Sequence, residues 1–185
     1  MAGMPAAAVA PALPRSALRR ARQALITVCC IGVLGLSVAA PAADPCDNDT
    51  LAPRALELIN RLRAAGAVCG GTAAAPAPPL EWSAAIAEVA RGHAQDMALQ
   101  RRLAHASSDG RHGGERLRSG GLEWQRWAEN LALGHRSLEH VVKHWSESAV
   151  HCENLMQPQM RQVGLACVPD VQGRLYWALS VVALR

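Results

Sequence analysis

The sequence predicts an α+β fold in which helices pack on a small, mainly antiparallel sheet. Three segments, beginning near residues 51, 84 and 138, carry apolar residues at the spacing of an amphipathic helix. Near the C-terminus, residues 163–168 and 175–184 are interpreted as strands, and the second is apolar throughout, as in a central strand. The turn between them contains Gln-Gly, which favours an antiparallel hairpin. Helices set against such a sheet define the α+β class.

Capping residues predict where the helices begin and end. Thr50 is expected to cap the first helix, which Gly66 ends. Ser83 and Ser137 are expected to cap the next two long helices. A short helix is expected over residues 115–119, between two Gly-Gly pairs.

The remaining segments are harder to assign from their pattern. Residues 122–133 are interpreted as a strand that is interrupted near its middle. Pro158 is expected to end a helical segment that follows His151. Residues 69–79 are rich in Gly, Pro and Ala, which predicts an irregular, exposed loop.

The first 43 residues have the layout of a secretory signal peptide. Four arginines precede the uncharged apolar run 24–38, and small residues follow at 39–43. The apolar run is shorter than the roughly 20 residues that span a membrane, so we expect cleavage between residues 39 and 43. Residues 44–49 would then be a short lead-in to one domain, 50–185, in a secreted or periplasmic protein.

The charge balance argues against a nucleic-acid partner. The formal net charge of +4 comes from the four arginines of the leader, because the remaining Lys and Arg balance the Asp and Glu. A nearly neutral domain offers no basic surface for nucleic acid. We expect the mature chain to be monomeric and to have no membrane span.

Four cysteines remain once the leader is removed. Export favours oxidation, so an even number suggests two disulfides, and three pairings are open. The absence of Cys-x-x-Cys spacing argues against a zinc–thiolate site. The four residues are Cys46, Cys69, Cys152 and Cys167.

Two polar residues are candidates for a site in the middle of the chain. His105 opens a Ser/Asp/Gly loop, where an imidazole can bind a transition metal or carry protons; an exposed loop His is the alternative. Glu129 lies within an apolar run. A carboxylate there needs a donor, from a His or from backbone N–H groups, unless it faces water.

A series of His and Glu residues follows at helical steps. His140, His144, Glu147 and His151 would share a face if one helix ran through all four. We expect only Glu147 and His151 to act together, and the others to lie on the solvated side of an amphipathic helix. His93 lies on an apolar stripe and is interpreted as a core His with satisfied hydrogen bonds.

No nucleophile motif accompanies these groups. The chain has no Gly-x-Ser-x-Gly, no His-Glu-x-x-His and no Gly-rich phosphate loop. His112 and His135 are interpreted as loop residues with no assigned partner. We therefore assign no catalytic residue.

Several short motifs occur in an order that indicates a family. They are PLEW at 79–82, HAQDM at 93–97, LAH at 103–105, AENLA at 128–132 and W-x-x-S-x-x-H-x-x-N-L-M at 145–156. In this order the chain resembles the CAP superfamily of cysteine-rich secretory, antigen 5 and pathogenesis-related proteins. The likeness is greatest to its compact bacterial secreted branch, the SCP-domain proteins, and it covers residues 51–182. It implies a three-layer α-β-α sandwich with a central cleft.

The resemblance also implies a cleft lined by two His and two Glu, in which the two His hold a divalent cation such as zinc. His105 and His151 match the two His. Glu129 matches the Glu of the family's Gly-Glu-Asn motif, with Ala128 in place of the Gly. Glu147 is the candidate for the second Glu, although it is displaced by one residue from the expected spacing.

The resemblance further implies how the cysteines pair. It joins Cys69 to Cys152 and leaves Cys46 to pair with Cys167. The first bridge would hold the neighbouring His151 in place.

Three functions remain open on this basis. The first is a non-enzymatic exported module whose cleft binds an envelope or extracellular ligand. The second is a metal-assisted hydrolase that uses water activated between His105 and His151. The third is a lipid or sterol binder. The missing nucleophile motif favours the first.

Overall fold

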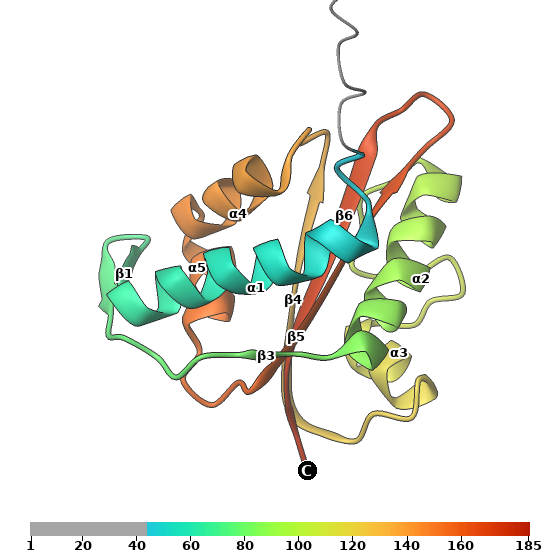
Figure 1. Ribbon diagram of the computed structural model, residues 1–185. Helices are drawn as coiled ribbons and strands as arrows, with labels where there is room; N and C mark the ends of the chain where they lie inside the picture. The colour runs from blue at the N-terminus through green and yellow to red at the C-terminus, as the bar shows by residue number, and fades with distance from the viewer. Residues whose placement is uncertain (1–43) are drawn as a thin grey trace, which may run out of the picture. The chain divides into compact units, whose positions relative to one another are not determined.

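The computed structural model describes residues 44–185, so the expected signal peptide and its cleavage site lie outside the described residues. Helices and strands mix along the described chain (Figure 1). The helices are α1 (Asn48–Ala65), α2 (Ala84–Gln100), α3 (Gly113–Ser119), α4 (Leu138–Glu147) and α5 (Ala149–Met156). The strands are β1 (Ala67–Cys69), β2 (Thr72–Ala74), β3 (Glu81–Trp82), β4 (Trp124–Leu133), β5 (Gln162–Pro169) and β6 (Leu175–Leu184).

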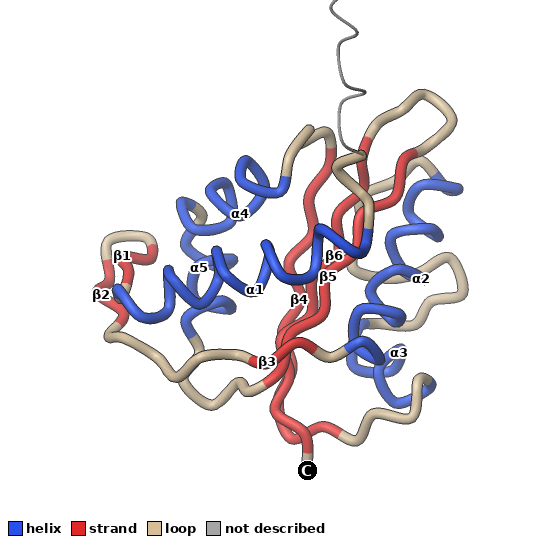
Figure 2. The backbone as a smooth tube through the Cα atoms, in the orientation of Figure 1, coloured by secondary structure: helices blue, strands red, loops and turns tan. Residues whose placement is uncertain are grey.

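The central sheet is covered by helices on both faces, which confirms the three-layer α-β-α sandwich. Its strand order is β3-β5-β6-β4, and β6 runs antiparallel to both of its neighbours. Only the short β3 is parallel to its partner, β5. Figures 1 and 2 show α1, α4 and α5 on one side of the sheet and α2 and α3 on the other. The strand β4 is therefore an edge strand with helix layers on either side.

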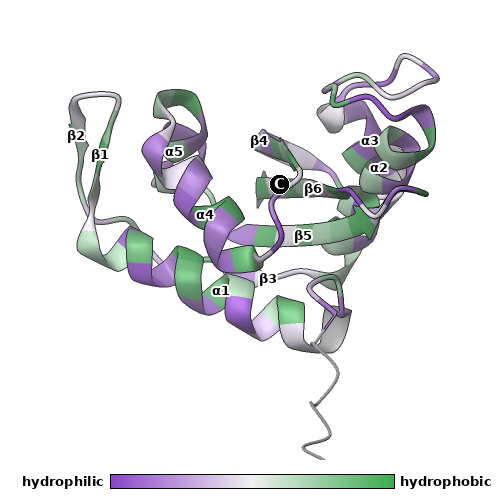
Figure 3. Ribbon diagram, turned by 90° about the horizontal axis from the view of Figure 1, so that it is seen from above, coloured by the Kyte–Doolittle hydropathy of each residue, from purple (hydrophilic) through white to green (hydrophobic). Residues whose placement is uncertain are grey.

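Residues of the central strand β6 alternate between the two layers. Trp177 and Leu179 belong to the apolar cluster shared with α1 and α4, whereas Tyr176 and Ala178 pack against α2. Because both faces are buried, β6 reads as one apolar run, and it is largely green in Figure 3. Among residues 44–185, no helix has the length and apolar character that a membrane span requires.

The predicted caps are found at most helix ends. Ser83 and Ser137 each accept a hydrogen bond from the backbone N–H three residues further on. Gly66 follows α1 with a φ of +75°, a conformation that glycine adopts without steric cost. The first helix begins at Asn48, two residues before the expected cap Thr50.

The Gly/Pro/Ala segment is not wholly irregular, contrary to the prediction. Strands β1 and β2 form a small antiparallel hairpin of their own, with Ala67 opposite Ala74. Gly70 and Gly71, at the turn, both have positive φ, as the tight turns of two-residue hairpins require. Irregular backbone is confined to the Ala/Pro run that follows, at residues 75–80.

Both expected disulfides are present. Cys46 is joined to Cys167 of β5, and Cys69 of β1 is joined to Cys152 of α5. Cys152 and Cys69 are fully buried together with Met156 in a small apolar cluster of their own. The second bridge therefore fastens α5 to the hairpin at a point next to His151.

Replacing Cys69 and Cys152 together by Ala is expected to lower the free energy of unfolding by about 2–4 kcal/mol, because the bridge closes a long loop in the unfolded chain. Urea unfolding followed by circular dichroism measures the change. A midpoint equal to that of the wild type would mean that packing alone holds α5 against the hairpin.

Candidate functional site

A cleft of about 390 Å³ lies along β4 and contains four histidines. One wall comes from the loop after α2, the floor from the end of β4, and the other wall from α4 and α5. The lining residues are Leu103, Ala104, His105, Leu131, Ala132, Leu133, His135, His144 and His151. The cleft thus combines apolar strand residues with imidazoles from both helix layers.

Glu129 orients the first histidine of the cleft. The Nδ1 atom of His105 donates a hydrogen bond to Oε1 of Glu129 at 2.9 Å. The Glu129 side chain is only 4% exposed, while that of His105 is 59% exposed. With its Nδ1 proton held by the carboxylate, neutral His105 keeps a free lone pair on Nε2.

Opposing effects set the pKa values of this pair. Burial of Glu129 acts to raise the pKa of its carboxyl, but the hydrogen bond from His105 and the Arg116 guanidinium lower it below the ordinary value. The same hydrogen bond raises the pKa of His105, against the effect of burial. The carboxylate therefore stays charged and its partner ring stays fixed.

Arg116 of α3 compensates the charge of this buried carboxylate. Its guanidinium forms an ion pair with Oε2 of Glu129 and is itself 7% exposed. It also donates to Ser107 Oγ and to the backbone oxygens of His105 and Arg111, at 2.8–3.0 Å. The sequence predicted a donor for Glu129 but not this one, because an Arg in a short helix carries no local pattern that marks it as buried.

His93 supports the same network from α2. Its Nε2 bonds the backbone oxygen of Ala104 at 3.0 Å, and its Nδ1 lies 3.2 Å from Ser107 Oγ. Burial lowers its pKa, which favours the neutral ring. The interpretation of His93 as a core His with satisfied hydrogen bonds is confirmed.

The next residue on β4 orients the opposite wall of the cleft. Successive strand residues face opposite sides of a sheet, so Asn130 points toward α5 while Glu129 points toward α2 and α3. Its Nδ2 donates to the backbone oxygen of His151 at 3.0 Å, and Asn154 donates to its Oδ1 at 2.9 Å. The dipeptide Glu129-Asn130 thus holds both the His105 wall and the His151 wall.

The buried ring nitrogen of His151 has no protein partner among the described residues. This nitrogen is Nδ1, which makes no hydrogen bond within the described part of the chain. Burial lowers the pKa of His151, and neighbouring His144 and His105 lower it further. The ring is therefore neutral at neutral pH, which is the form that binds metal.

Two histidines that sequence analysis left out of the site also line the cleft. The rings of His135 and His144 lie with centroids 4.7 Å apart, and those of His144 and His151 lie 6.1 Å apart. Burial, together with His144 and His140, lowers the pKa of His135. The helical spacing in the sequence drew attention to His144, but no regular spacing links His135 to His144 or His151.

Glu147 is not brought to the cleft, which corrects its assignment as the second Glu. It forms an ion pair with Lys143, one turn earlier on the same helix, and its side chain is 63% exposed. Ser148 has extended backbone angles and separates α4 from α5. Because the helix is interrupted between Glu147 and His151, the two residues do not share a helical face.

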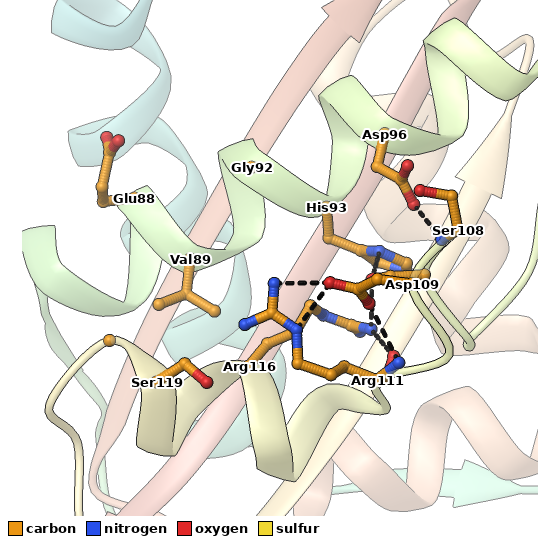
Figure 4. Close-up of a pocket in the computed structure, with 12 residues that line it drawn as sticks. Glu88, Val89, Gly92, His93, Asp96, Ser108, Asp109, Arg111, Arg116 and Ser119 are labelled. Atoms are coloured by element: carbon orange, nitrogen blue, oxygen red, sulfur yellow. Dashed lines mark hydrogen bonds and ion pairs between the residues drawn. The ribbon is translucent and has the colours of Figure 1, made fainter.

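A second, polar pocket of about 410 Å³ lies between α2 and α3 (Figure 4). His93 and Arg116 line it together with Asp109 and Arg111, which pair with each other. Both ring nitrogens of His93 and both terminal nitrogens of Arg116 bond the protein groups described above. This pocket thus marks the outer side of the network that supports His105.

No three His, Cys, Asp or Glu side chains within residues 44–185 converge as a metal site would require. His105 and His151 line the same cleft. Two imidazoles make a weaker site than the three-ligand sites of catalytic zinc.

The chain belongs to the CAP family. Residues 56–181 match the profile of this family, which is described as the cysteine-rich secretory protein family. The chain is also 29% identical over 90 residues to the uncharacterized protein YkwD of Bacillus subtilis (strain 168). That match covers 49% of this chain and 35% of YkwD, so the chain spans about a third of its relative.

Solved structures show the same fold. An extracellular SCP-domain protein from Bacillus anthracis superposes with a TM-score of 0.62 at 23% identity, over 72% of this chain and 40% of that one. An outer surface protein from Borrelia burgdorferi gives a TM-score of 0.59 at 19% identity, over 74% of this chain and 92% of that one. Similar chains thus include an extracellular protein and an outer-surface protein.

Proposed function

We propose that this protein is an exported CAP module that binds a divalent cation such as zinc between His105 and His151, and an extracellular or envelope ligand in the same cleft. The observation that carries the proposal is the hydrogen bond from His105 to buried Glu129. A carboxylate that holds one nitrogen of a metal-binding His fixes the tautomer and increases the basicity of the other nitrogen.

The second ring supports the proposal through its unsatisfied nitrogen. Buried polar atoms in proteins nearly always have a partner, so the orphaned Nδ1 of His151 suits an ion or a bound polar group. The positive charge that His105 carries when protonated contributes to the lowered pKa of His151. A neutral His151 ring is the form that can bind a divalent cation.

The chemistry of the cleft favours binding over catalysis. A bound zinc ion would supply a Lewis-acidic centre with open coordination positions. Glu129 is already occupied by His105 and Arg116, and Glu147 faces away, so neither carboxylate is free to take a proton from a reactant. The residues of the chain therefore hold and orient a ligand, and the apolar floor of Leu131 and Leu133 receives its uncharged part.

Export is supported by two further observations. The disulfides Cys46–Cys167 and Cys69–Cys152 suit an oxidising compartment. The similar structures named above come from extracellular and outer-surface proteins.

Zinc titration by calorimetry on the purified, oxidised protein tests the cation site. We expect His105→Ala and His151→Ala each to abolish the same zinc-binding event. Glu129→Gln should weaken that event by about 10–100-fold, because a carboxylate that holds a metal-binding His tunes metal affinity by this amount.

Glu147→Gln is the matched control, since it makes the same chemical change at an exposed carboxylate that is paired with Lys143. It should leave zinc binding unchanged. Binding that is equal in the wild type and in the His105→Ala/His151→Ala variant would refute the cation site. Thermal unfolding of each variant separates loss of the site from loss of the fold.

A further inference from the structure

Two histidines outside the proposed cation pair lie side by side on the α4 side of the cleft. We propose that His135 and His144 form a second binding site for a divalent transition-metal ion such as Cu²⁺, Ni²⁺ or Zn²⁺, beside the position between His105 and His151. This site goes beyond the proposed function because it uses different ligands.

The separation of the two rings suits one shared ion. Their centroids are 4.7 Å apart and their planes are inclined by 35°. Metal–nitrogen bonds of about 2.0–2.1 Å, with each ring centre roughly 1 Å farther out, place two rings around a tetrahedral ion about 5 Å apart. The rings of His144 and His151, at 6.1 Å, approach the upper limit for a shared ion. His135 is therefore the better partner for His144.

The four imidazoles of the cleft divide into pairs. Since no three candidate ligands in residues 44–185 converge on one point, His144 does not complete a three-ligand centre with His105 and His151. The arrangement gives two neighbouring positions with two protein ligands each. Both positions leave coordination sites open to water or to a ligand in the cleft.

Both members of the second pair are held in place by buried tryptophans. Trp177 of β6 donates from Nε1 to the backbone oxygen of His135 at 2.8 Å. Trp145, the residue after His144, donates from Nε1 to the backbone oxygen of Leu131 at 3.1 Å. Both indoles are fully buried. The backbone positions of the two ligands are thus fixed before an ion binds, which reduces the cost of ordering them.

The type of donor selects the type of ion. The charged and polar side chains that line this cleft are all imidazoles, and none is a carboxylate. Calcium and magnesium require oxygen ligands, whereas imidazole suits zinc, copper and nickel. Affinity for such a site rises along the series to copper, so Cu²⁺ is the most sensitive probe.

Equilibrium dialysis of the oxidised protein against Cu²⁺, with metal analysis, tests the second site. We expect the wild type to bind two equivalents and the His135→Ala/His144→Ala variant to bind one. The His105→Ala/His151→Ala variant should also bind one, and the electron paramagnetic resonance signals of these two variants should differ. His112→Ala, which removes an exposed His at the start of α3, should keep both equivalents.

Each outcome separates this site from the first. A wild-type protein that binds one equivalent, lost only in the His135→Ala/His144→Ala variant, supports the second site and refutes the first. Retention of the wild-type number of equivalents by the His135→Ala/His144→Ala variant overturns the second site. The second site is also overturned if the His140→Ala variant loses the second equivalent of Cu²⁺ while the His135→Ala variant retains it. The ion would then bind the helical pair His140 and His144.

Discussion

Replacing Arg116 by Met is expected to lower the free energy of unfolding by about 3–5 kcal/mol, the usual cost of removing one partner of a buried ion pair. Glu129 would remain buried with its Oε2 atom unpaired. Ser107 and the backbone oxygens of His105 and Arg111 would also lose their common donor. The loop that carries His105 should therefore loosen, and zinc binding should weaken with stability. Urea unfolding and calorimetry measure the two effects.

Arg111→Met is the matched control on the same loop, because Arg111 is an exposed arginine whose ion pair with Asp109 is solvated. Exposed pairs contribute about 0–1 kcal/mol. The double variant Arg116→Met/Glu129→Gln removes both buried charges, and it should recover part of the stability that Arg116→Met alone loses. Equal stabilities of Arg116→Met and Arg111→Met would show that Glu129 does not depend on the guanidinium.

The sequence predicted the parts of the site that follow from local rules. A carboxylate within an apolar run needs a donor, and Glu129 has two. A His was one of the expected donors, and the family resemblance placed His105 in the same cleft, but Arg116 was missed because it reaches Glu129 only through the packing of α3 on the sheet. His135 was missed for the same reason, since only the fold brings the loop after β4 against the end of α4.

The helical step from Glu147 to His151 predicted a shared face that does not exist. The periodicity of a sequence indicates which residues would lie on one face if a helix continued. It does not indicate where the helix is interrupted. Ser148 has no Pro or Gly beside it to signal the break between α4 and α5. The sheet was easier to predict, because burial on both faces makes β6 apolar at every position except Ser180, whichever helices cover it.

Gly164→Ala is expected to destabilise the protein by about 3 kcal/mol, at the upper end of the cost of overpacking a core. A Cβ added at Gly164 would lie 2.1 Å from the backbone nitrogen of Ala87 and 2.5 Å from the carbonyl carbon of Ile86. These are backbone atoms of α2, so no side-chain rotation can relieve the clash. The helix would have to move away from β5, and it carries His93 and leads directly into the loop of His105.

Gly92→Ala provides the control within the same helix. Nothing lies within 4 Å of a Cβ at Gly92, so this change should stabilise α2 by about 0.5–1 kcal/mol, the difference in helix propensity between the two residues. The same substitution at two positions should thus have opposite signs in thermal unfolding. An unfolding temperature of the Gly164→Ala variant equal to that of the wild type would show that α2 does not pack directly on β5. The conclusion that α2 supports His105 through His93 would then also be wrong.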